Sequence, residues 1–177
     1  MAFNINDIKG ALKLGGARGT LFQVQITNVA NSVADNIAPF LIESTQLPSA
    51  QLSTIEVPYF GRRIKLAGDR SYGSWQVRVI NDENFLVRNA LEEWSNKING
   101  FTSNIRNQVS YQSEAHISQY SKTGEIVRTY NFHNIWPSEI APIDLDWSST
   151  DIERFVVTFQ YDYWTVDGAT GNAGGNI

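Results

Sequence analysis

The chain has 177 residues, of which 42% are hydrophobic, and a formal net charge of −4. This length fits one domain with a sizeable core, and the acidic balance argues against tight nucleic-acid binding, which depends on Lys and Arg neutralising phosphates. The absence of cysteine excludes disulfides, thiolate zinc sites and thiol nucleophiles. Neither a signal-peptide pattern nor a membrane-length apolar run is present, so we expect a soluble, unprocessed chain without membrane anchoring.

The first part of the chain predicts an arm followed by strands. Residues 1–20 mix scattered apolar positions with four glycines, so we expect an arm that is mobile or ordered by a partner. Residues 21–29 alternate apolar and polar side chains, which indicates a half-buried strand. Residues 31–36 indicate a loop, and residues 40–47 indicate a second strand that Pro48 ends.

The next segments predict a hairpin arm and a further strand. Residues 52–57 and 62–67 have the pattern of two paired strands, and residues 58–61 have the composition of the turn between them. A second turn is expected at residues 68–69. Residues 74–81 alternate again, which indicates a strand.

One helix is predicted, over residues 83–99. Its apolar side chains follow the spacing i, i+3, i+4, i+7 of an amphipathic stripe: Val87, Ala90, Leu91, Trp94 and Ile98. Asp82 is the expected N-cap and Gly100 the expected terminator. Residues 100–114 are polar and predict no regular element.

The second half predicts another hairpin and a long strand. Residues 115–121 and 125–133 are its two sides, with the turn at residues 122–124. Residues 145–147 indicate a short strand. The clearest alternation in the chain, over residues 154–164, indicates the strongest strand.

These elements predict a mainly β protein. About eight strands and one helix fit an antiparallel β-barrel or two-layered sandwich, with the helix packed against it. We expect an N-terminal arm (1–20), a single β-barrel domain (21–164) and a flexible C-terminal tail (165–177).

Little in the sequence points to catalysis. The glycines of residues 15–19 lack the Gly-Lys-Ser/Thr of a phosphate-binding loop. His116 and His133 are two ligands at most, whereas catalytic zinc needs three. Asp144 and Asp146 could hold a divalent cation or serve as acid and base, but we interpret them as part of a negatively charged surface. We therefore expect a non-enzymatic protein without cofactor or metal.

Basic and aromatic residues cluster around the predicted arm. The cations are Arg62, Arg63, Lys65 and Arg70, with Tyr59, Phe60 and Tyr72 nearby. Such a cluster could bind single-stranded nucleic acid. We prefer the alternative that these cations pair with acids of a neighbouring subunit.

An ordered set of short motifs runs through residues 18–164. It comprises Leu21-Phe22-Gln23-Val24, Leu47-Pro48, Ala67-Gly68-Asp69-Arg70, Trp75-x-Val77, Asn81-Asp82-Glu83, Ile135-Trp136-Pro137, Leu145-Asp146-Trp147, Phe155-x-Val157-Thr158 and Asp162-Tyr163-Trp164. In this order the set resembles the tail tube protein family of contractile-tailed bacteriophages of the T-even type. The chain departs from the family pattern at residues 28–39, at residues 100–114 and after Trp164.

The resemblance implies a β-barrel subunit of an inner tail tube. It implies homo-hexameric rings that stack into a tube inside a contractile sheath, with baseplate and tail-terminator proteins at the two ends. The lumen would hold the tape-measure protein and then DNA, without sequence-specific binding. The implied location is the virion, after assembly in the host bacterial cytoplasm.

Three groups of side chains are our candidates for these roles. The arm, residues 49–67, would contact the adjacent ring, unless it is an ordinary intramolecular hairpin; its candidates are Ile55, Val57, Tyr59, Phe60, Arg62 and Arg63. The candidates for salt bridges between subunits are Asp69, Arg70, Asp144 and Asp146. The candidates for lining the lumen are Gln23, Gln25, Thr27, Gln119, Thr158, Gln160 and Asp162. A negative wall would repel phosphates and let DNA slide.

Three other functions stay open on the sequence alone. An inner-tube subunit of a related injection machine, such as type VI secretion or a tailocin, would have no need to repel DNA. Five tryptophans and seven tyrosines would also fit a small-ligand or carbohydrate-binding β-barrel. The third is an enzyme that uses the region of Asp144 and Asp146.

Overall fold

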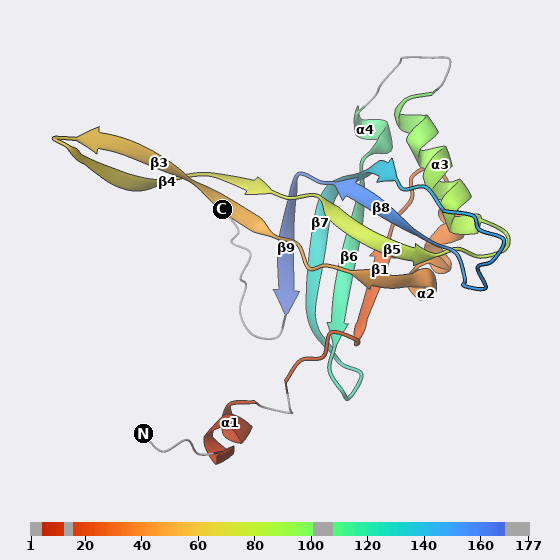
Figure 1. Cartoon of the computed structure of the whole chain (residues 1–177), viewed down its shortest axis with the longest axis horizontal. Coiled ribbons are helices and arrows are strands. Elements are labelled where there is room, and N and C mark those ends of the chain that lie inside the picture. Colours follow the sequence, from red (N-terminus) through yellow and green to blue (C-terminus); the bar gives the residue numbers. More distant parts are fainter. Residues whose placement is uncertain (1–4, 13–15, 101–107, 169–177) are drawn as a thin grey trace.

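The structure, a computed structural model, describes residues 5–12, 16–100 and 108–168 and is built on two antiparallel sheets that share one strand (Figure 1). The first sheet has the order β1 (Phe22–Ile26), β6 (Ser113–Tyr120), β7 (Ile126–Ile140) and β9 (Tyr163–Gly168). The second sheet continues from β7 through β8 (Arg154–Gln160) and β5 (Trp75–Ile80) to β2 (Ile42–Thr45). The predicted mainly β, antiparallel fold is confirmed.

The strand path does not close into a barrel. Its two ends, β1 and β2, are not paired with each other. Aromatic side chains of both sheets meet between the layers instead. Trp75 of the second sheet stacks on Phe132 of the first with ring centroids 4.4 Å apart, and Phe159 lies 5.5 Å from Trp75. Of the two predicted architectures, the structure therefore has the two-layered one.

Strand β7 takes part in both sheets because it bends at Asn134. Its residues 128–133 pair with β9, whereas residues 136–140 pair with β8. Asn134 has a φ of 58°, in the left-handed region that asparagine tolerates better than most residues. Its Nδ2 donates a hydrogen bond to Asp162 Oδ2 at 2.6 Å, and Asp162 N–H donates to His133 O at 3.1 Å. These bonds join the bend of β7 to the corner between β8 and β9.

The prediction of one strand over residues 154–164 is wrong. The chain leaves the second sheet after Gln160 and enters the first sheet at Tyr163. Aromatic residues continue to alternate through this corner, so the pattern does not reveal it. Strand β9 also extends to Gly168, beyond the expected start of the tail, and residues 169–177 lie outside the described part.

The predicted helix is confirmed as α3 (Leu86–Ile98), which begins three residues later than expected. Phe85 occupies the N-cap position, but Asp82 Oδ1 still accepts a hydrogen bond from Leu86 N at 3.0 Å. Trp94 is fully buried, packs against Phe159 and donates through Nε1 to the backbone O of Tyr111 at 2.7 Å. This helix therefore covers an end of the aromatic core.

Other predictions need correction at the level of single elements. The segment 40–47 begins as the short helix α2 (Ala38–Leu41) and only then becomes β2, because Pro39 in the first turn favours a helix start. No strand forms at residues 145–147, which lie in the loop between β7 and β8.

Three further short helices occur in the described part of the chain. They are α1 (Ile5–Ala11), η2 (Ser32–Asn36) and α4 (Gln108–Tyr111). Helix α1 stands apart from the sheets, with Ile5 and Ile8 exposed (Figure 1). Within the described ranges, no helix combines the length and the apolar character that crossing a membrane would require.

The predicted second hairpin, β6 and β7, and the predicted arm are both confirmed. The arm consists of β3 (Ala50–Tyr59) and β4 (Arg62–Tyr72), which pair over a longer range than expected. The two strands form a separate sheet.

Replacing Trp75 tests whether the aromatic core stabilises the fold. Trp75 is 2% exposed and donates through Nε1 to Thr45 Oγ1 and to Gln46 O. Trp75→Ala should therefore lower the free energy of unfolding by about 3–5 kcal/mol, measured by urea denaturation followed by circular dichroism. Trp147→Ala is the control, because Trp147 is fully exposed and its loss should change stability by less than about 0.5 kcal/mol. Equal stability of the two variants would contradict this core.

Candidate functional site

The outward face of the first sheet is polar across four strands. Because side chains alternate along each strand, the strand register places three cross-strand rows on this face. The rows are Gln23, Ser118, Thr129 and Asp167; Gln25, His116, Asn131 and Thr165; and Thr27, Glu114, His133 and Tyr163. We call these twelve residues the polar face. They include two carboxylates, of Glu114 and Asp167, and no Lys or Arg.

Side chains of the polar face bond to one another. Asn131 Nδ2 donates to Asp167 Oδ2 at 2.7 Å, and His116 Nε2 lies 3.0 Å from Gln25 Oε1. His133 lies between Glu114 and Thr165, 3.6 Å from the Glu114 carboxylate and 3.2 Å from Thr165 Oγ1. The face is thus a connected polar layer.

Three of the predicted lumen-lining residues, Gln23, Gln25 and Thr27, lie on the polar face. Gln119 does not, because it pairs with Phe22 and lies on the opposite side of the sheet. Alternation shows which residues share a face within one strand, but only the register between strands shows which faces coincide.

The remaining predicted lining residues lie elsewhere. Thr158 and Gln160 belong to β8 in the second sheet, and Asp162 lies at the corner that joins β8 to β9. The seven predicted residues therefore do not form one surface. Most members of the polar face come from β6, β7 and β9 and were missed, although the alternation in residues 115–121 and 125–133 separates their two faces.

The arm projects away from the two sheets (Figure 1). All residues from 50 to 67 are exposed. An isolated two-stranded ribbon is at best marginally stable in water, because it has no layer to pack against. Within the described chain, neither face of this ribbon is covered by another element.

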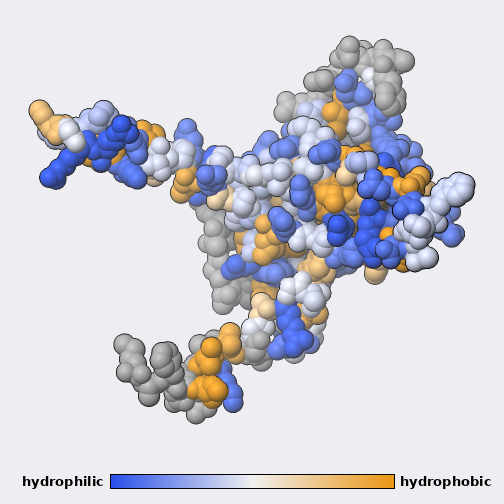
Figure 2. Space-filling view, viewed as in Figure 1, coloured by the Kyte–Doolittle hydropathy of each residue, from blue (hydrophilic) through white to orange (hydrophobic). Residues whose placement is uncertain are grey.

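One face of the arm is apolar and the other is charged. The apolar pairs are Ile55 with Leu66 and Val57 with Ile64, followed by Tyr59 near the tip. On the opposite face, Arg63 Nη1 lies 2.9 Å from Glu56 Oε2, and Lys65 is opposite Glu56. Figure 2 shows apolar and hydrophilic surface side by side along the arm. The apolar face, with side chains 40–62% exposed, is the largest exposed apolar feature of the arm.

The tip of the arm is a two-residue turn formed by Phe60 and Gly61. Their φ angles, 41° and 78°, are both positive, as in a type I′ hairpin turn. This conformation costs a residue with a side chain about 1–2 kcal/mol. Phe60 is nevertheless 91% exposed, and its ring meets only the edge of Tyr59, with centroids 4.7 Å apart. Burial within the described chain therefore does not offset the strain of this conformation.

The prediction of a turn at residues 68–69 is wrong. Gly68 and Asp69 instead form a bulge of β4 opposite Ser53. A Cβ on Gly68 would collide with Ser53 Oγ and lie 3.0 Å from Ile55 Cγ1, which explains why glycine occupies the bulge.

The four predicted salt-bridge residues lie in two separate places. Asp69 and Arg70 are near the base of the arm, and Asp144 and Asp146 are in the loop between β7 and β8. Within the described ranges, none of the four belongs to an ion pair of the chain itself. Hydrogen bonds from Ser148 N and Oγ lower the pKa of the Asp146 carboxyl. No group of three or more His, Asp or Glu side chains suited to a metal occurs in the described part.

The sequence model of the family described as phage tail tube protein matches residues 16–167. The chain belongs to this family. Tail tube protein gp19 of Enterobacteria phage T4 is 30% identical over 165 residues, which is 90% of this chain and 98% of that protein. The tail tube protein of Serratia phage KSP90 is 27% identical over 154 residues, 83% of this chain and 87% of that protein. These relatives are structural tail tube proteins and not enzymes.

Solved structures share the fold. The tube-terminating cap of the anti-feeding prophage has a TM-score of 0.66 at 19% identity, covering 86% of this chain and 91% of that chain. A chain of the sheath–tube complex of an extracellular contractile injection system has a TM-score of 0.61 at 17% identity, covering 95% and 100%. At these identities the likeness concerns the fold alone.

Substitutions of Phe60 can separate the effect of this residue on the stability of the chain from its effect on self-association. Phe60→Asn should leave the free energy of unfolding of the isolated chain unchanged or raise it by up to about 1–2 kcal/mol, because asparagine tolerates positive φ. It should also reduce self-association measured by sedimentation velocity, because the exposed ring is gone. Phe60→Tyr keeps the ring and is the control. Undiminished association of Phe60→Asn would argue against a role for the ring.

Proposed function

We propose that the chain is the subunit of the inner tube of a contractile phage tail, with six copies in a ring and rings stacked into a tube. The observation that carries this proposal is the exposed apolar face of the arm, which a second copy of the chain would bury. Membership of the tail tube family supports it. The arm contacts the adjacent ring through Ile55, Val57, Tyr59, Phe60, Arg62 and Arg63.

Within a ring, the first sheet supplies the wall of the tube. Its edge strands, β1 and β9, each have one unpaired side within the described chain. Such edges pair readily with strands of another chain, and symmetric copies can do so until the ring closes. The polar face then lines the lumen.

The composition of the polar face suits passage of DNA. Its two carboxylates repel phosphates, and it presents no Lys or Arg that would hold them. The lumen holds the tape-measure protein first and DNA later, without sequence-specific binding. The lack of cations also favours a DNA conduit over the tube of a protein-delivering injection machine, which shares the fold.

The partners outside the lumen follow from the same assembly. A contractile sheath surrounds the tube, and baseplate and terminator proteins close its ends, consistent with the sheath–tube, terminator and baseplate assemblies that contain proteins of this fold. Asp69, Arg70, Asp144 and Asp146 form salt bridges between subunits. The protein resides in the virion tail and is assembled in the cytoplasm of the host bacterium.

Deleting residues 59–62 tests the role of the arm. The variant should fold normally, because residues 59–62 are exposed and lie outside the core, but it should no longer form long tubes. Negative-stain electron microscopy measures the tubes, and circular dichroism checks the fold. Tubes of normal length from a folded deletion variant would remove the case for the arm.

A lysine on the polar face tests the lumen. Thr129→Lys places one cation per subunit on this face, so its tubes should retain duplex DNA in a salt-sensitive manner when DNA and tubes are sedimented together. Thr158→Lys places the same charge on the second sheet and is the matched control. DNA retention that is equal in the two variants would count against the polar face as the lumen wall.

A further inference from the structure

We propose that the arm of one subunit docks on two loops at the opposite end of a subunit in the adjacent ring. The loops are residues 81–85 and 142–153, and together we call them the loop end. This inference rests on the proposed function, in which the arm contacts the adjacent ring, and adds the surface that receives it.

The second sheet separates the arm from the loop end. Strand β5 begins at Trp75, just after the arm, and ends at Ile80, where it pairs with Arg154 at the start of β8. The two loops therefore lie together at the far end of the sheet (Figure 1). A contact between two unlike ends leaves a free arm and a free loop end at each step, so it repeats along a tube.

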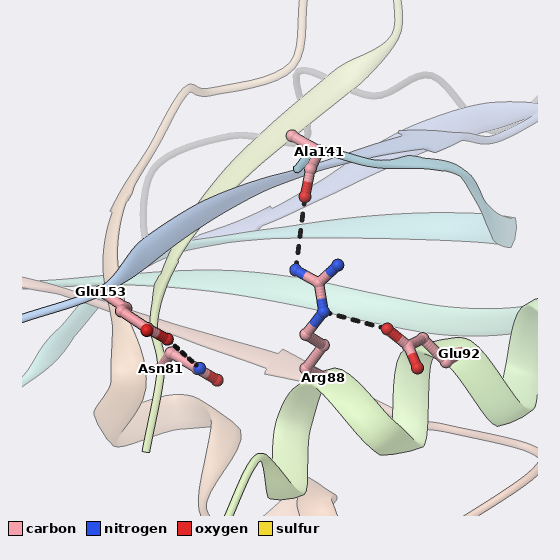
Figure 3. Close-up of polar contacts among 5 residues, drawn as sticks. All are labelled: Asn81, Arg88, Glu92, Ala141 and Glu153. Atoms are coloured by element: carbon pink, nitrogen blue, oxygen red, sulfur yellow. Dashed lines mark hydrogen bonds and ion pairs between the residues drawn. The ribbon is translucent and has the colours of Figure 1, made fainter. Parts of the chain in front are cut away.

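The base of the loop end is held firmly. Arg88 of α3 donates to Ala141 O at 3.4 Å and to Glu92 Oε1 at 2.9 Å (Figure 3). Asn81 Nδ2 donates to Glu153 Oε2 at 2.8 Å and so joins the first loop to the second. A surface with an anchored base needs little reordering when a partner binds.

Beyond this base, large apolar side chains are exposed. Trp147 is 106% exposed, Leu145 80% and Ile152 63%. Ile152 lines one hollow together with Leu145 and another together with Phe85. Tryptophan is enriched among the residues that dominate binding energy at protein interfaces, and exposed apolar patches mark sites of interaction.

The charges of the loop end and of the arm are opposite. The two loops contain six acidic residues and no Lys or Arg: Asp82, Glu83, Asp144, Asp146, Asp151 and Glu153. The rest of the chain has the other 12 acidic residues against 14 Lys and Arg, a net charge of +2. The distal arm, residues 56–65, carries Arg62, Arg63 and Lys65 against Glu56, also a net +2.

Each surface thus combines exposed apolar side chains with charges that match those of the other. Tyr59 and Phe60 at the tip supply aromatic area, and Trp147 supplies it on the loop end. The opposite charges steer the encounter and select the orientation, because exposed ion pairs add specificity more than affinity. A second copy of the chain therefore fits the loop end.

Charge reversal on each side, followed by their combination, tests the docking. Asp144→Lys with Asp151→Lys reverses two loop charges while leaving Asp146 and Glu153, which bond to Ser148 and Asn81. Arg62→Glu with Arg63→Glu reverses the arm. Each double variant should form tubes at least tenfold shorter in electron micrographs, and the chain carrying all four substitutions should recover long tubes. Glu125→Lys, in the exposed turn between β6 and β7, is the control and should assemble normally.

The outcomes separate the two proposals. If the loop variant forms normal tubes, the proposed docking is wrong and the proposed tube function still stands. The same holds if the loop variant forms normal tubes and loses only the binding of the sheath. A combined chain no better than either double variant would also overturn it. Failure of the unsubstituted chain to form any ring or tube would instead count against the proposed function.

An engineered disulfide provides an independent test of where the arm docks, because the chain itself contains no cysteine that could interfere. Tubes of a chain carrying Pro58→Cys and Thr150→Cys should yield a ladder of crosslinked subunits on non-reducing gels after mild oxidation. Pro58→Cys combined with Thr123→Cys should yield none. Crosslinking that is equal in the two chains, or absent from both, would overturn the proposed contact.

Discussion

The structure depends on one strand serving two sheets. Strand β7 bends at Asn134, and the chain turns at Asp162 to meet this bend. The two sheets therefore share β7 and pack against each other around a common aromatic core. The same bend places β9 beside the first half of β7, which widens the first sheet to four strands. Without this corner, Trp75 and Phe132 would not be brought together, and β9 would not form an edge of the first sheet.

Two surfaces stay exposed once the core has formed, the polar face and the apolar face of the arm, and they differ in how they interact with water. Side chains of the polar face bond to one another and include no Lys or Arg, so water can cover this face at little cost. The apolar face of the arm differs, since Ile55, Val57 and Ile64 stay in contact with water in the isolated chain. In the tube that we propose, the polar face would line the lumen and the apolar face of the arm would join adjacent rings.

The sequence was sufficient to predict elements whose pattern lies entirely within their own residues. The stripe of Val87, Ala90, Leu91 and Trp94 predicts α3, and the turn signals around Phe60 and Gly61 predict the arm. Features that depend on pairing between distant segments were not accessible in this way. The corner at Asp162 lies within unbroken alternation, Gly68 has the composition of a turn but fills a bulge, and the side on which Gln119 lies depends on its partner Phe22.

The construction of the arm restricts how such a protein can change its dimensions. Inserting one residue in each strand would turn the distal part over, so that Tyr59 and its neighbours would exchange sides with Arg63 and Lys65. An unbroken apolar stripe survives only when each strand gains or loses two residues together, a step of about 7 Å in reach. The reach of an arm of this kind should accordingly change in discrete steps, because an intermediate length would interrupt its apolar stripe.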